Sequence, residues 1–196
     1  MILTSITAGQ GIETQIFYDE VQPTVPDLCM RGLAHGHLRQ DVLACHACVL
    51  SKYEKPLPLT HPEARVMIIG ETPEDVLFDS PQGHQLAQCL KDCGYDFQDL
   101  YLTSLVKCVG SKEYARCVHH LVAEVMVVRP VIAICLGYNP SLAFVDAPEV
   151  GQFVPILPST TVLTTYSFVD ANDQTLAVLH QQFSYIQSQL QVVKSA

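Results

Sequence analysis

Two pairs of cysteines, far apart in the sequence, constrain this chain more than any other feature. Cys45 and Cys48 bound a Cys-His-Ala-Cys motif, and Cys108 and Cys117 follow beyond a predicted strand, helix and second strand. Thiolates are preferred ligands of iron-sulfur clusters and of structural zinc. We therefore expect a fold that closes a long loop and brings four sulfurs together. Cysteine spacing alone does not choose between the two kinds of site.

Length and composition indicate a single cytoplasmic domain. The chain has 196 residues, 48% of them hydrophobic, which is enough for a full core. Its apolar runs are far shorter than the ~20 residues that span a bilayer, and its N-terminus lacks the pattern of a signal peptide. In a reducing compartment, the eight cysteines favour ligands and buried thiols over disulfides.

The net charge predicts weak or no direct DNA binding. Eleven Lys and Arg residues stand against twenty Asp and Glu residues, giving a net charge of -9. Neutralisation of phosphates by cationic side chains is the main source of non-specific affinity for nucleic acids. This chain has few cationic side chains to neutralise phosphates.

Alternating strands and helices predict an α/β fold. Buried apolar runs at residues 66–69, 100–106, 131–136 and 161–166 are typical of parallel strands. Helical patterns occupy residues 27–44, 81–93, 114–128 and 173–193. Asn139-Pro140 predicts the start of a short helix, with Asn139 as its N-cap and Pro140 as its first residue. The order predicts a parallel central sheet of about four strands, flanked by helices on both faces.

The first 27 residues are expected to form an N-terminal extension, and residues 28–196 the domain with the cysteine cluster. Residues 1–27 show no clear period, and Ile12, Ile16 and Phe17 form a small apolar group within them. Such a segment is either a strap across the domain or a peptide that docks on a partner.

Three further cysteines and two histidines have simpler interpretations. Cys89 and Cys93 recur at helical spacing on an apolar stripe, which favours buried thiols over ligands, and Cys135 lies inside a predicted strand. His119 and His120 adjoin Cys117. They either donate hydrogen bonds to cluster sulfurs or lie on the exposed side of a helix.

Four segments and one further cysteine form a joint pattern: 45–48 (CHAC), 66–71 (VMIIGE), 101–108 (YLTSLVKC) and 129–137 (RPVIAICLG), together with Cys117. Over residues 45–187, this pattern resembles the iron-sulfur uracil-DNA glycosylases. The resemblance implies that Cys45, Cys48, Cys108 and Cys117 ligate a [4Fe-4S] cluster, with zinc as the alternative. It also gives Glu71 as the one surviving catalytic candidate, unless this carboxylate only accepts backbone N–H groups in its turn.

Three departures from that family affect its chemistry. Ser104 stands where the family has an Asn that reads the uracil edge, and Ser167 stands where it has the His of a His-Pro-Ser motif. Residues 72–78 replace the segments that form the uracil pocket. Losing one oriented charge-stabilising donor typically costs ~100- to 1,000-fold in rate. We therefore expect a chain that is not an enzyme, with Glu71 as a vestige.

These departures favour a non-catalytic iron-sulfur adaptor in DNA replication. Residues 11–17 (GIETQIF) resemble the start of the N-terminal peptide of the psi accessory subunit of the clamp loader of bacterial DNA polymerase III, which has a related α/β fold without glycosylase activity. The resemblance implies the clamp-loader core and the chi subunit as partners, chi in turn meeting single-strand-binding protein, with Ile12, Ile16 and Phe17 as anchors. The alternative is a divergent DNA glycosylase for uracil or another damaged base. A cluster-bearing redox sensor is a third possibility.

Overall fold

The computed structural model describes residues 25–57, 61–110, 116–169 and 171–194. The predicted anchors Ile12, Ile16 and Phe17 lie outside this part of the chain. The expected division between an extension and a domain at residue 28 therefore stays a prediction.

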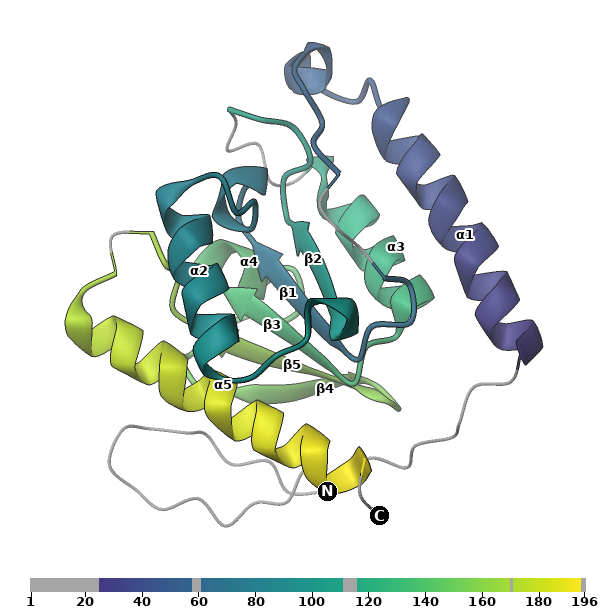
Figure 1. Cartoon of the computed structure of the whole chain (residues 1–196). Helices are drawn as coiled ribbons and strands as arrows, with labels where there is room; N and C mark the ends of the chain where they lie inside the picture. Colours follow the sequence, from purple (N-terminus) through teal and green to yellow (C-terminus); the bar gives the residue numbers. More distant parts are fainter. Residues whose placement is uncertain (1–24, 58–60, 111–115, 170, 195–196) are drawn as a thin grey trace.

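A five-stranded sheet with strand order β2-β1-β3-β5-β4 forms the centre of the fold (Figure 1). β1, β2, β3 and β5 pair in parallel, and β4 pairs antiparallel with β5. The predicted α/β fold is confirmed, although the expectation of about four strands omitted β4. The strands are β1 (Val66–Gly70), β2 (Leu100–Ser104), β3 (Ile132–Leu136), β4 (Phe153–Leu157) and β5 (Thr160–Thr165).

The missed strand contains a proline. Pro155 lies in the middle of β4, and proline has no N–H to give to a strand ladder. β4 is tolerated because it lies at the edge of the sheet, where its register with β5 is irregular between Pro155 and Leu157. A proline inside an apolar run hides such an edge strand from sequence analysis.

Helices cover both faces of the sheet, as the sequence predicts. In Figure 1, α2 and α5 lie on one face, and α3 lies on the other with α1 outside it. α1 is held to α3 by a hydrogen bond of 3.3 Å from Arg31 Nη1 to the Val128 carbonyl. The helices are α1 (Val25–Leu43), α2 (Pro81–Asp92), α3 (Val118–Val128), α4 (Tyr138–Leu142) and α5 (Asp173–Lys194).

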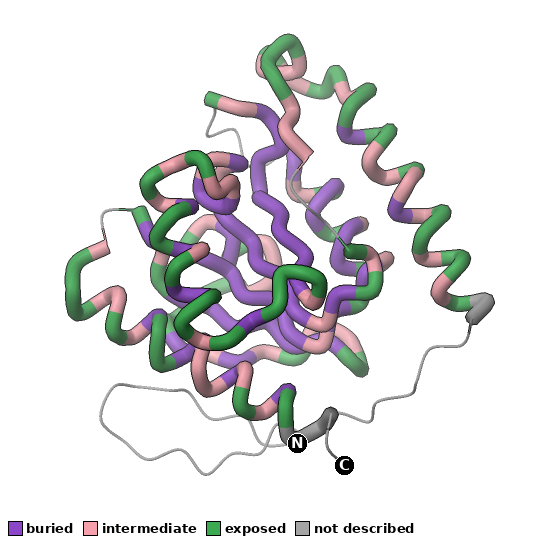
Figure 2. Tube along the Cα trace, in the orientation of Figure 1, coloured by how far each residue is buried: buried purple, intermediate pink, exposed green. Residues whose placement is uncertain are grey.

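The side chains of the central strands alternate between two cores. Ile68 and Leu102 pack with α2 and α5, whereas Met67 and Tyr101 pack with α3. Both cores are fully buried, which explains why these strands are continuous apolar runs (Figure 2). On α5, an apolar stripe of Leu179, Phe183, Ile186 and Leu190 packs into the same core as Ile68 and Leu102.

Local signals set the helix bounds. Ser80 is the N-cap of α2 and accepts a hydrogen bond from the Gly83 N–H at 2.9 Å, and Pro81 follows as the first helical residue.

None of the helices in the described ranges combines the length and the apolar character that a bilayer span requires.

Candidate functional site

The carboxyl ends of the parallel strands meet at one edge of the sheet, and Glu71 lies there directly after β1. The segment that follows β2 is held to it, because the Val106 N–H donates to the Glu71 carbonyl at 2.9 Å. From the turn after β3, Asn139 Nδ2 donates to Glu71 Oε2 at 3.0 Å. Ligands of open α/β sheets bind at this kind of edge.

A buried aspartate fixes the turn that carries Glu71. Asp75 Oδ2 accepts the N–H groups of Glu71 and Thr72, each at 2.9 Å. Gly70 makes room for it, since a Cβ at Gly70 would lie 2.8 Å from Asp75 Cβ. Burial raises the pKa of Asp75, against the lowering effect of these two backbone hydrogen bonds. The role that was considered for the Glu71 carboxylate, acceptance of backbone N–H groups in this turn, is thus performed by Asp75.

The turn after β3 brings Asn139 to the edge. Gly137 adopts a φ of 101°, a conformation that favours glycine, and its N–H donates to the Thr165 carbonyl at 2.9 Å. Asn139 lies inside α4, whose N-cap is Gly137, so its predicted role as a helix cap was wrong. Sequence analysis missed its contact with Glu71; the signal was a polar residue placed just after a buried parallel strand.

The two serines at the departure positions both hydrogen-bond within their own turns. Ser104 Oγ donates to the Val106 carbonyl at 2.6 Å, and Ser167 Oγ accepts the Val169 N–H at 3.0 Å. A Cβ at Gly137 would come 3.4 Å from Ser167 Cβ, so the turns after β3 and β5 touch. Both serines therefore lie at the same edge as Glu71.

Two tyrosines at this edge are open to solvent. Tyr138 follows β3 and is 62% exposed, and Tyr166 follows β5 and is 41% exposed. β3 and β5 are neighbours in the sheet, with Leu136 opposite Thr165. The edge near Glu71 therefore presents two aromatic side chains.

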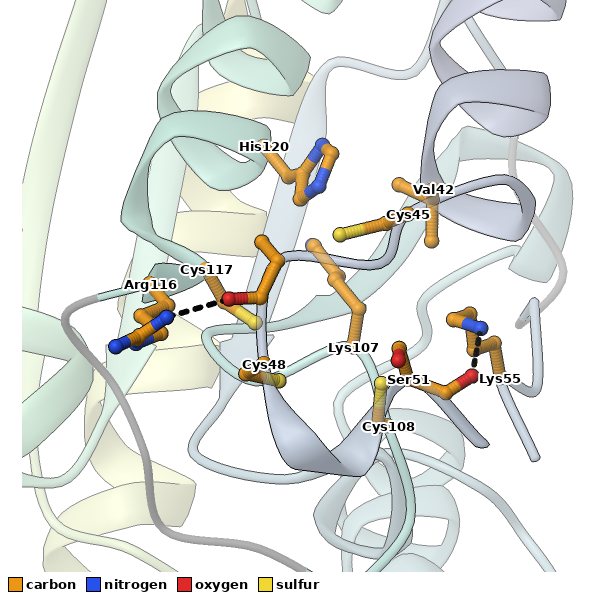
Figure 3. A pocket seen from close by; sticks show the side chains of 11 residues that line it. Val42, Cys45, Cys48, Ser51, Lys55, Lys107, Cys108, Arg116, Cys117 and His120 are labelled. Carbon is orange, nitrogen blue, oxygen red and sulfur yellow. Dashed lines mark hydrogen bonds between the residues drawn. The ribbon is translucent and has the colours of Figure 1, made fainter. Parts of the chain in front are cut away.

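The four cysteines of the sequence motif come together at one hollow (Figure 3). Cys45 and Cys48 lie in the loop after α1, Cys108 follows β2, and Cys117 is the N-cap of α3. All four line the hollow, with their sulfurs facing a common space. The fold therefore brings the three segments that carry these cysteines to one hollow, and their role as cluster ligands stays a prediction.

Polar contacts hold the three segments around the hollow. Arg116 Nη1 donates to the Ala47 carbonyl at 2.6 Å, which ties the start of α3 to the Cys-His-Ala-Cys motif. The Val109 N–H donates to the Glu54 carbonyl at 3.0 Å, which joins the segment after β2 to the same loop. The Lys107 N–H donates to the Cys117 sulfur. The geometry therefore does not depend on the thiols alone.

Burial and mutual repulsion keep two of the thiols protonated. Burial is the largest cause that raises the pKa of Cys108, and the three other cysteines add to it against the lowering effect of Lys55. Burial likewise raises the pKa of Cys117, against the backbone hydrogen bond from Lys107. A metal centre would remove these protons, since it binds thiolates.

His120 faces the hollow with an orphaned nitrogen. It is only 7% exposed, and Nε2 has no hydrogen-bond partner within the described ranges. Burial lowers the pKa of His120, followed by the neighbouring His119. The expectation of an exposed helix side holds for His119 and is wrong for His120. A buried N–H aimed at a sulfur-lined space is suited to donate to a cluster sulfur.

A buried ion pair between Lys107 and Glu124 lies next to the hollow. Lys107 Nζ donates to Glu124 Oε2, Thr103 Oγ1 and the Ser104 carbonyl, each at 2.7 Å. Lys107 also lines the hollow. Sequence analysis missed this pair, because Lys107 and Glu124 lie on different elements and no periodic pattern connects them.

The donor set around the hollow fits an iron-sulfur cluster. Four thiols, a backbone N–H on one sulfur and an orphaned imidazole nitrogen match what such clusters use. Cationic Lys55, Lys107 and Arg116 line the same space and would offset the negative charge of four thiolates. Within the described ranges, no three His, Cys, Asp or Glu side chains are arranged as a site for a single metal ion.

Comparison with known proteins identifies the family. Residues 57–189 match the uracil DNA glycosylase superfamily. The chain belongs to this superfamily. The match includes Glu71, Asn139, Cys108 and Cys117, whereas Cys45 and Cys48 precede it.

Two curated relatives of this superfamily member are distant. The type-4 uracil-DNA glycosylase of Thermotoga maritima is 29% identical over 101 residues, 45% of this chain and 53% of that protein. The type-4 uracil-DNA glycosylase of Archaeoglobus fulgidus is 26% identical over 113 residues, 50% of this chain and 57% of that protein. The chain thus spans about half the length of the curated relatives it matches.

These relatives correct the prediction that the chain is not an enzyme. Both are named as glycosylases, so the superfamily member is similar to enzymes. The treatment of Glu71 as a vestige rested on the same prediction. Neither relative is named as a clamp-loader subunit. The link to the clamp-loader core and chi stays a prediction that these relatives do not support.

Proposed function

We propose that this chain is a DNA glycosylase that hydrolyses the bond between a deaminated base, uracil first, and its deoxyribose in single-stranded DNA. The hydrogen bond of 3.0 Å between Asn139 Nδ2 and Glu71 Oε2, at the carboxyl edge of the sheet, carries this proposal. The pair lies within the region that matches the superfamily. The substrate class follows from the names of the two relatives.

Glu71 would act on the water that attacks C1′ of the deoxyribose. As the bond from the water oxygen to C1′ forms and the bond from C1′ to the base breaks, the carboxylate takes a proton of that water. The base leaves with the bonding electron pair as an anion and then takes up a proton from solvent. The Asp75 hydrogen bonds to the Glu71 and Thr72 N–H groups fix the backbone of the turn, and Asn139 orients one carboxylate oxygen. The geometry is therefore set before substrate binds.

Asn139 would also read the base. A side-chain amide has one carbonyl acceptor and two N–H donors, and Glu71 takes one of these donors. The remaining groups are complementary to the N3–H and carbonyl groups of uracil. Asn139 would thereby supply the amide that the chain lacks at Ser104.

Tyr138 and Tyr166 would hold the single strand by stacking. Base stacking on an aromatic side chain contributes about 1–3 kcal/mol per base and tolerates any sequence. It compensates for the net charge of -9, which leaves little phosphate attraction. A single strand also avoids the few kcal/mol needed to extract a base from a duplex.

We further propose that Cys45, Cys48, Cys108 and Cys117 hold a [4Fe-4S] cluster with a structural role. The cluster would cross-link three segments of the chain, and its stabilising effect does not require a redox change. Zinc is the alternative for the same four thiols. Anaerobically purified protein should be brown, with iron and sulfide bound; colourless protein with one zinc would establish the alternative.

A base-release assay tests the glycosylase proposal. The full chain, purified anaerobically, is incubated with a labelled single-stranded oligonucleotide that holds one uracil, and abasic sites are cleaved with alkali. Matched oligonucleotides hold hypoxanthine, xanthine or, as a control, thymine. We expect cleavage at uracil above the protein-free background and none at thymine. No release from any of the deaminated bases would contradict the proposal.

A further inference from the structure

Helix α1 buries one side and leaves the other exposed (Figure 2). His35 and Val42 are buried on the inner side. On the outer side, the exposed fractions are 65% for Met30, 63% for Leu33 and 53% for Leu43. Large apolar side chains that gather on one exposed surface mark a site of interaction with another molecule.

The exposed side of α1 carries a stripe without charge. Positions 29, 32, 36, 40 and 43 follow one another in steps of three and four, so they lie along one line of the helix. Together with the neighbouring position 33 they form the α1 stripe, which consists of Cys29, Gly32, Leu33, Gly36, Gln40 and Leu43. None of these residues is acidic or basic. The stripe therefore suits the charge-poor core of a protein interface and not the phosphates of a nucleic acid.

Two glycines lie in the middle of this stripe. Glycine in the interior of a helix lowers the stability of the helix. A Cβ at Gly32 or at Gly36 would meet nothing within 4 Å, so packing inside the chain does not require a glycine at either position. Because both side chains are absent, the backbone of a second helix can approach α1 closely at this point.

The α1 stripe is complementary to itself when two copies of α1 run antiparallel. With the two-fold axis at Gly36, residues that are equally far before and after Gly36 lie opposite each other. Cys29 then meets Leu43 of the second copy. Gly32 likewise meets Gln40, and the two copies of Gly36 meet at the axis. Each long side chain thus faces a short one, and the same surface serves both copies, as an isologous interface requires.

We propose that the chain forms an antiparallel homodimer through the α1 stripe, with Gly36 at the two-fold axis. α1 has 19 residues, so the contact is one helix pair about 28 Å long. Interfaces that bury less than about 1,200 Å² in total belong to weak, reversible complexes. We therefore expect an equilibrium between monomer and dimer that depends on the protein concentration.

Sedimentation velocity tests the proposal on the full chain, purified anaerobically and measured over a wide range of concentration. The sedimentation coefficient should rise with concentration from the value of a monomer toward that of a dimer. A wild-type chain that stays monomeric at its highest soluble concentration would overturn the proposal.

Gly36→Glu should abolish the dimer, because it places two like charges next to each other at the axis. It should not destabilise the monomer, since Glu is a better helix former than Gly and its Cβ meets nothing within 4 Å. The unfolding midpoint of dilute protein should therefore be no lower than that of the wild-type chain. Gln85→Glu makes the same change of charge at an exposed position of α2 and should dimerise like the wild-type chain. A Gly36→Glu chain that dimerises as strongly as the wild-type chain would overturn the proposal.

Gln40→Cys tests the direction of the pair together with the native Cys29. In the antiparallel pair, position 40 of one copy and Cys29 of the other are offset by three residues, about 4.5 Å along the axis. Within one chain the two positions are about 16 Å apart, which a short thiol cross-linker does not span. Cross-linking should give a dimer on a denaturing gel, with tryptic peptides 1–31 and 40–52 joined.

The wild-type chain, which keeps Gln40, is the control for this experiment and should remain a monomer on the gel. Links between two copies of peptide 1–31 would show a parallel pair and would overturn the proposed arrangement. None of these readouts depends on base release, so failure of this proposal is distinguishable from failure of the glycosylase proposal.

Discussion

The four-cysteine hollow and the Glu71 edge lie on the same sheet but differ in how much of the family pattern they keep. The hollow brings together all four thiols that the resemblance implies. The edge keeps Glu71, has serines at two functional positions and gains Asn139 as a partner of Glu71. The hollow joins three separated segments, so we expect the loss of one thiol to lower the stability of the fold. At the edge, Glu71 and Asn139 are only partly buried, so we expect changes to these two side chains to alter chemistry at little cost in stability.

The largest effect should come from the hollow. Cys108→Ser would remove one ligand of the proposed cluster and so weaken the link between the segment after β2 and the loop after α1. Because the cluster closes long loops, we expect a loss of at least the about 2–5 kcal/mol that removal of one disulfide costs. Urea unfolding under anaerobic conditions, with iron determined in the same samples, measures both losses. Cys135→Ser, a buried cysteine away from the hollow, should keep its iron.

Disruption of the buried ion pair between Lys107 and Glu124 should have the next largest effect on stability. Glu124→Leu leaves Lys107 buried without its carboxylate, and removal of one partner of a buried pair costs roughly 3–5 kcal/mol. The double variant Lys107→Met with Glu124→Leu should regain most of this loss, because it leaves no unpaired charge. Urea unfolding of the three proteins provides the comparison. A double variant no more stable than Glu124→Leu would contradict this explanation.

At the edge, Asn139→Ala should affect chemistry more than stability. Loss of a hydrogen bond to a charged group corresponds to about 1.5–3 kcal/mol, or roughly a 10- to 100-fold slower release of uracil. The unfolding midpoint should change little, since Asn139 is only partly buried. Single-turnover assays of base release separate the chemical step from binding. An unchanged rate would show that Asn139 does not orient Glu71.

The smallest effect concerns pH. Burial, followed by Arg39, lowers the pKa of His35, whose Nε2 is 3.2 Å from the Tyr101 hydroxyl. The unfolded chain therefore binds more protons below the ordinary histidine pKa of about 6.5, and stability should fall as the pH drops through that value. Burial of His120 acts in the same direction. His35→Gln should show a shallower fall in unfolding midpoint between pH 7.5 and 5.5 than the wild-type chain.

The sequence predicted the elements that have local signals. Ser80 and Pro81 marked the start of α2, and the apolar runs marked the four parallel strands. Pro155 concealed β4 because proline is rare within strands. The four cysteines could be grouped because their chemistry is distinctive even at long range.

Contacts that depend on three-dimensional proximity could not be predicted. Asn139 lies 68 residues from Glu71, and its Asn-Pro context indicated a helix cap. Asp75 acts through the backbone of its own turn, which Gly70 accommodates. His120 and His119 are adjacent in sequence, yet only the fold determines which of them faces the hollow.

The most direct test of Glu71 as the catalytic base compares the rate of uracil release by the Glu71→Gln variant with that of the wild-type chain. The unfolding midpoint is measured in the same samples. Gln keeps an acceptor for Asn139 but cannot take a proton from water. The account predicts a rate about 100- to 1,000-fold lower, with an unfolding midpoint close to that of the wild-type chain. Equal rates for the two proteins, or no release by either, would contradict it.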